Sequence, residues 1–77
     1  MIDLETMELL ERLNVLSKPL NKSYALIGNS TYLQLFACTQ DDVIEMCCST
    51  PKSVRRVLKT LLNSVPHEYA NHNTRKE

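Results

Sequence analysis

The sequence predicts a small, mainly α domain of the α+β class, with an N-terminal helix, a β-hairpin and two further helices. Apolar residues recur at helical spacing near the N-terminus and again after Thr50. Between these stretches lies a β-prone segment that holds the only glycine, Gly28. Because 77 residues leave room for one domain, we place it at residues 1–66 and expect a flexible tail at 67–77.

The first helix is expected to begin after Asp3, whose carboxylate can accept a hydrogen bond as N-cap. Pro19 should end this helix, since the residue before a proline is pushed out of the helical conformation. Three leucines recur within the helix at a spacing of four and three, namely Leu9, Leu13 and Leu16. This stripe faces either the core of the domain or a second copy of the chain, as a dimer contact.

Residues 24–37 are expected to form two strands joined at Gly28. The alternation of a strand would place Gln34 and Phe36 on one face of the hairpin. Leu33 and Leu35 would then lie on the other face. A short helix that starts near residue 30 is the competing interpretation.

Two helices are expected after the hairpin. Thr39 is a suitable N-cap for a helix over residues 40–48, and Thr50 is a suitable N-cap for a second helix over residues 51–64. Pro66 should end the second helix. The expected core comprises Leu9, Leu10, Leu13, Leu16, Leu33, Leu35, Val43, Met46, Cys47, Val54, Val57, Leu58 and Leu61.

Residues 40–59 resemble the helix-turn-helix unit of bacterial and phage transcription regulators. Four positions that this family keeps apolar are occupied by Val43, Cys47, Val54 and Val57. The preceding run also resembles the short strand that enters this motif in winged-helix regulators. Ile44 and Cys48 depart from the pattern, because the family usually has small residues at these two close-packed places.

The resemblance implies a sequence-specific, double-stranded DNA-binding regulator, with residues 51–64 as recognition helix and a dimer formed through the first helix. An α-helix fits the major groove, and basic side chains bind guanine edges or phosphates. The residues implied for DNA binding are Thr50, Lys52, Ser53, Arg55, Arg56 and Lys59. The competing interpretation of the basic side chains is an ordinary solvated helix face.

The charges of the chain are unevenly distributed, although nine basic and nine acidic side chains give a net charge of zero. Residues 1–50 hold seven acids and three bases, whereas residues 51–77 hold six bases and two acids. Because dedicated DNA-binding domains are usually basic overall, the zero net charge also favours an alternative function. In that alternative, the chain is a protein-interaction module, such as an anti-activator or adaptor, whose acidic N-terminal helix binds a protein partner.

No catalytic or metal-binding pattern is recognised. The side chains of metal-ligating type are those of Cys38, Cys47, Cys48, His67 and His72. Their spacing lacks the paired Cys-x2–4-Cys arrangement of zinc sites, so we expect the cysteines to behave as small apolar residues. Neither a nucleophile elbow nor a phosphate loop occurs, and we expect no enzyme activity and no cofactor.

The expected location is the cytoplasm, and the helix-turn-helix resemblance implies a bacterial or phage protein. The N-terminus opens with acids rather than with bases before an apolar run, so no secretory signal is expected. No apolar stretch approaches the ~20 residues that span a bilayer, so no membrane partner is expected.

Overall fold

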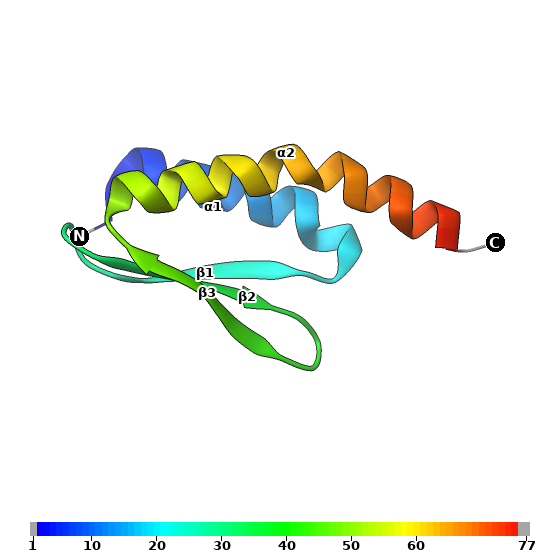
Figure 1. Cartoon of the computed structure of the whole chain (residues 1–77), viewed down its shortest axis with the longest axis horizontal. Helices are drawn as coiled ribbons and strands as arrows, with labels where there is room; N and C mark the ends of the chain where they lie inside the picture. The colour runs from blue at the N-terminus through cyan, green and yellow to red at the C-terminus, as the bar shows by residue number, and fades with distance from the viewer. Residues whose placement is uncertain (1, 76–77) are drawn as a thin grey trace.

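The computed structural model describes the backbone of residues 2–75 and the side chains of residues 2–69 (Figure 1). The elements in chain order are α1 (Leu4–Ser17), the short 3-10 helix η1 (Lys18–Leu20), β1 (Ser23–Gly28), β2 (Leu33–Cys38), β3 (Val43–Ser49) and α2 (Pro51–Arg75). The strands form an antiparallel sheet in the order β1-β2-β3, and both helices cover the same face of it. The predicted α+β class, the N-terminal helix and the β-hairpin are confirmed.

The start and the end of α1 follow from its flanking residues. The backbone N–H of Thr6 donates to Oδ2 of Asp3 at 3.3 Å, so Asp3 is the N-cap that the sequence predicted. The helix ends at Ser17, two residues before Pro19, which lies in η1. Asn21 then adopts a left-handed conformation with φ of 59° and redirects the chain into the sheet.

The β1–β2 hairpin turns at Gly28 because only glycine fits its backbone. Gly28 has φ of 148°, and a Cβ atom at this position would lie 2.2 Å from the carbonyl oxygen of Tyr32. Leu33 and Leu35 point to the helix side and are fully buried, as the predicted alternation required.

The prediction of a helix over residues 40–48 was wrong, because residues 43–49 form β3. Thr39 and Asp42 build the β2–β3 turn instead of a helix cap. The Thr39 N–H donates to the Asp42 carbonyl at 2.8 Å, and the Asp42 N–H donates to the Thr39 hydroxyl at 3.1 Å. The same short polar side chains favour turns and helix caps, and β-branched Val43 and Ile44 favour the strand. The structure therefore does not confirm a helix-turn-helix.

The prediction that Pro66 ends the last helix was also wrong, because α2 continues through Pro66 to Arg75. Contacts on both sides of the proline hold the helix in place. Val65 is almost fully buried, and the Tyr69 hydroxyl donates to the carbonyl oxygen of Leu16 at 2.6 Å. These contacts offset the cost of about 3 kcal/mol that a proline inside a helix carries. The mobility predicted for residues 67–77 stays a prediction. Residues 76 and 77 lie outside the part of the chain that the structure describes.

The core lies between the helices and one face of the sheet. Five side chains in it are fully buried, namely Leu13, Leu33, Leu35, Val54 and Leu58. Leu10, Tyr24 and Val65 complete it, and of these only Leu10 was predicted. Three residues that we expected in the core are exposed instead: Leu16 (41%), Val43 (68%) and Met46 (43%). Val43 and Met46 are exposed because the predicted helix there is a strand.

The two helices run side by side in the same direction, as Figure 1 shows. Near the end of α1, Lys22 forms an ion pair with Glu68 of α2, and this contact raises the pKa of Lys22 above its ordinary value. The hydrogen bond from Tyr69 to Leu16 lies at the same end. Together these contacts fix the second half of α2 against α1.

A side chain of α1 also covers the free edge of the sheet. The Tyr24 N–H donates to Oδ1 of Asn14 at 2.6 Å, and Nδ2 of Asn14 donates to the Tyr24 carbonyl at 3.0 Å. One amide side chain therefore satisfies both backbone groups of an edge residue, which would otherwise attract another strand. This pair also fixes the position of α1 relative to β1.

Replacing Asn14 with Ala should reduce the free energy of unfolding by about 1–2 kcal/mol, because both partly buried backbone groups of Tyr24 lose their partner. Urea denaturation followed by circular dichroism measures the change. Asn63→Ala is the matched control, because Asn63 is exposed on α2 and the substitution gains the same helix propensity. Equal stability of the two variants would contradict the role that we assign to Asn14.

Candidate nucleic-acid interface

The start of α2 positions most of the residues that the sequence singled out for DNA binding. Thr50 caps the helix, since its carbonyl accepts from Val54 N at 3.0 Å and its hydroxyl accepts from Ser53 N at 3.4 Å. Val54 and Leu58 are fully buried against the sheet. Because these two residues fix the rotation of the helix about its axis, they also determine which side chains face outward.

Three of the predicted residues, Lys52, Arg56 and Lys59, lie on one exposed stripe of α2. We call these three residues the basic stripe. Their spacing of four and three places them on one helix face over about 10 Å. In the described part of the chain, no acidic group lies within ion-pair distance of any of them. The three positive charges are therefore available to an anionic partner.

Arg55, in contrast, is directed toward the N-terminus of α1. Its Nη1 lies 3.3 Å from Oδ2 of Asp3, and its Nε lies 3.9 Å from Oε1 of Glu5. Nη1 also donates to the Thr6 hydroxyl at 3.3 Å. Arg55 thus links the two helices, and these contacts occupy the guanidinium group that the resemblance implied for DNA binding.

Asp3 is the acidic centre of this link. The Thr6 hydroxyl donates to Oδ1 of Asp3 at 2.6 Å and makes the largest contribution to lowering the pKa of Asp3 below 3.8, to which the charge of Arg55 adds. Because the folded-state pKa lies below the unfolded value, ionised Asp3 stabilises the fold above about pH 3.8. This contribution is lost as the pH falls through the folded-state pKa.

A shallow groove of about 390 Å³ runs beside the basic stripe. It is lined by Glu5, Lys52, Arg55, Arg56 and Lys59. Four of these five side chains are cations that only donate hydrogen bonds, and Arg55 lies beside the Glu5 carboxylate, so the cations left for the oxygens of an anion are those of the basic stripe. The hydroxyls of Thr50 and Ser53 lie at the same end of α2 and bond to each other at 3.3 Å.

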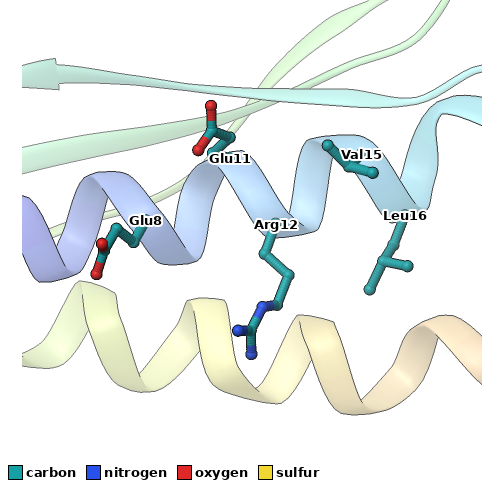
Figure 2. Close-up of a pocket in the computed structure, with 5 residues that line it drawn as sticks. All are labelled: Glu8, Glu11, Arg12, Val15 and Leu16. Atoms are coloured by element: carbon teal, nitrogen blue, oxygen red, sulfur yellow. The ribbon is translucent and has the colours of Figure 1, made fainter.

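The acidic helix α1 carries a second groove, of about 450 Å³ (Figure 2). Figure 2 shows Glu8 and Arg12 directed to the side of α2, whereas Glu11 and Val15 lie on the opposite side of α1. Val15 is 66% exposed, so this face combines apolar and acidic groups. The surface that the sequence suggested for a protein partner is therefore accessible.

The three leucines predicted as a dimer contact lie mainly within the domain itself. Leu13 is fully buried, and Leu9 packs against the core. Leu16 is partly exposed and lines a groove between α1 and α2 together with Lys59. The three leucines of α1 thus face mainly the core of the domain, as the first of the two interpretations expected. Their burial does not support a dimer contact through α1.

The sheet separates Cys47 from the other two cysteines. Cys47 lies on the side of the helices, and burial raises the pKa of its thiol above the ordinary value. Cys48 is exposed, and all three cysteines are free. Within residues whose side chains are described, no group of three His, Cys, Asp or Glu is placed to hold a metal ion.

The sheet face that no helix covers was missed by sequence reasoning. Partner residues of an antiparallel pair share a face, so the register identifies this outer face as Ser23, Ala25, Ile27, Gln34, Phe36, Cys38, Val43, Glu45 and Cys48. Six of these nine residues are apolar. The β-branched pair Val43 and Ile44 was the one signal in the sequence that pointed to the third strand.

The link between Arg55 and Asp3 can be tested by titration. Arg55→Ala should raise the pKa of Asp3, because it removes a positive charge 3.3 Å from the carboxylate. NMR titration of the side-chain carboxyl shift measures this change. Arg56→Ala removes the same charge one residue away, on the exposed stripe, and should leave the pKa of Asp3 unchanged. Equal shifts in both variants would show that Arg55 has no specific contact with Asp3.

No helix in the described part of the chain is both long and apolar enough to cross a membrane. Comparison of the chain with known protein families, with curated proteins and with solved structures finds no match.

Proposed function

We propose that this protein binds double-stranded DNA through its phosphate backbone, with the basic stripe of Lys52, Arg56 and Lys59 as the contact surface. The observation that carries this proposal is the alignment of three exposed, unpaired cations on one face of α2 within the described part of the chain. Lysine and arginine bind phosphate oxygens through charge and hydrogen bonds. The dipole of α2 adds a partial positive charge at the same end.

The geometry favours binding that does not depend on base sequence. The inner side of α2 is packed on the sheet through Val54 and Leu58, and α1 lies beside it. A helix held in this way presents one stripe, which suits phosphates along a duplex better than base edges inside the major groove. Three phosphate contacts give modest, salt-sensitive affinity. This proposal replaces the sequence-specific recognition that the helix-turn-helix resemblance implied.

A second candidate is a protein-interaction module that uses the acidic helix α1. It is favoured by the groove of Figure 2, which combines two carboxylates and one guanidinium with two exposed apolar side chains, those of Glu8, Glu11, Arg12, Val15 and Leu16. Such a surface is complementary to a basic amphipathic segment of a partner protein, because the charges attract and the apolar side chains are buried on contact. In this case, the basic stripe would be an ordinary solvated helix face.

Fluorescence anisotropy with a labelled duplex of random sequence tests the first proposal. In about 50 mM salt the chain should bind, and the slope of log K against log salt should be about −2.7, because three phosphates are neutralised. Lys52→Ala combined with Arg56→Ala should weaken binding at least tenfold. The matched control is Arg12→Ala combined with Lys18→Ala, which removes two exposed cations of the α1 and η1 region and should retain the affinity.

The outcomes decide whether the basic stripe is a DNA contact. Equal losses in the two double variants, or no binding at low salt, would rule out the basic stripe as a DNA contact. A duplex RNA of the same length, measured in parallel, distinguishes a preference for DNA from binding to any duplex backbone. Selection from a random pool should yield no enriched motif, and a strongly enriched motif would contradict backbone-directed binding.

A further inference from the structure

A groove with a volume of about 420 Å³ runs between the two helices. Three of its lining residues belong to α1 and three to α2, and the six are Leu9, Arg12, Leu16, Lys59, Leu62 and Asn63. We call it the interhelical groove. It opens to solvent, because the side chains of Arg12, Leu16, Lys59 and Asn63 are exposed. Lys59 also belongs to the basic stripe, so the two surfaces are continuous.

The floor of the groove is apolar and fixed in place. Leu9 and Leu62 are half-buried and pack against the core, whereas Leu16 is 41% exposed. The hydrogen bond from the Tyr69 hydroxyl to the Leu16 carbonyl anchors this end of α1 to α2. Leu9 and Leu16 are seven residues apart, which places them on one side of α1 at a separation of about 10.5 Å. The groove therefore offers a preformed apolar strip that is two helical turns long.

Cations line both walls of the interhelical groove. Arg12 lies on α1 and is directed toward α2 in Figure 2, and Lys59 lies on α2. None of the six lining residues is acidic. Among the residues with described side chains, no acidic group lies within ion-pair distance of Arg12 or Lys59. Glu8, one turn before Arg12, lines the neighbouring groove of Figure 2 and not this one. The two walls therefore attract carboxylates to both sides of the apolar floor.

We infer that the interhelical groove binds an acidic amphipathic helix of a partner protein. Such a helix places apolar side chains at positions i and i+7 on the leucine floor, because these positions span the same two turns as Leu9 and Leu16. Its aspartates and glutamates, on both sides of the apolar stripe, pair with Arg12 and Lys59. A small anionic amphiphile fits less well, since small-molecule sites enclose most of their ligand, whereas four of the six residues that line this groove are exposed. A DNA duplex would leave the leucines without an apolar partner.

The inferred partner covers Lys59 and therefore competes with DNA. An acidic helix in the groove places carboxylates beside Lys59, which is one of the three cations of the basic stripe. A duplex then loses one phosphate contact and meets a charge of its own sign. This consequence rests on the proposed function, whereas binding of the acidic helix itself does not.

Selection from a displayed pool of helical peptides with randomised surface residues tests the inference. The full chain is immobilised, and the peptides have about 18 residues, which is long enough to span the floor. The retained peptides should be acidic and should carry apolar residues at positions i and i+7. Retention of basic peptides would overturn the inference and would point to the acidic groove of Figure 2 instead. A retained pool without a charge bias, or no retention at all, would also overturn it.

Matched double variants locate the site of the most enriched peptide. Arg12→Ala combined with Leu16→Ala removes one cation and one exposed apolar side chain of the groove, and it should weaken peptide binding by about tenfold or more. Lys18→Ala combined with Val15→Ala removes the same two kinds of side chain from a different groove of α1, and it should leave peptide binding unchanged. Fluorescence anisotropy with the labelled peptide measures both, and circular dichroism should show the same helical content in both. Equal weakening in the two double variants would overturn the inference.

DNA binding is a separate readout on the same proteins. Neither double variant removes a cation of the basic stripe, so both should bind the labelled duplex as the unchanged chain does. The enriched peptide should displace the duplex from the unchanged chain, and a peptide that binds without displacing it would overturn the position that we assign beside Lys59. A chain that binds the peptide but no DNA would support this inference and contradict the proposed function, so the two can fail separately.

Discussion

The structure depends on burying one face of a three-stranded sheet under two parallel helices. Leu33 and Leu35 of the central strand are fully buried against Leu13 of α1 and against Val54 and Leu58 of α2. Both helices lie on the same side of the sheet, so no helix covers the other sheet face. The orientation of each helix follows from this layer, because the buried residues determine which side chains face solvent.

The two helices are aligned by contacts at both ends. At the N-terminal end, Arg55 joins Asp3, Thr6 and Glu5, and at the other end Lys22 pairs with Glu68. Of the four cations in the first half of α2, Arg55 is the one whose contacts hold the two helices together. The other three have no acidic partner in the described part of the chain and form the basic stripe. Structural and functional roles are thus divided between neighbouring residues of similar charge.

Features that depend on a few adjacent residues could be predicted from the sequence. The cap at Asp3, the end of α1 before Pro19, the turn at Gly28 and the start of α2 at Thr50 are all confirmed, because each depends on the chemistry of a few adjacent residues. The cations of the basic stripe were also identified from the sequence. The sequence did not show which of these cations lack an acidic partner, because ion pairing with the start of α1 involves residues about fifty positions away.

The secondary structure of residues 43–49 and the ion-pair partner of Arg55 depend on tertiary contacts. The apolar run that starts at Val43 fits a helix or a strand, and pairing with β2 selects the strand, since backbone hydrogen bonds to a neighbouring strand become available there. That choice removed the first helix of the expected helix-turn-helix and created the outer face. Likewise, Pro66 does not end α2, because Val65 and Tyr69 bind to the rest of the domain. Long-range packing of this kind outweighs local preference, and no pattern of neighbouring residues records it.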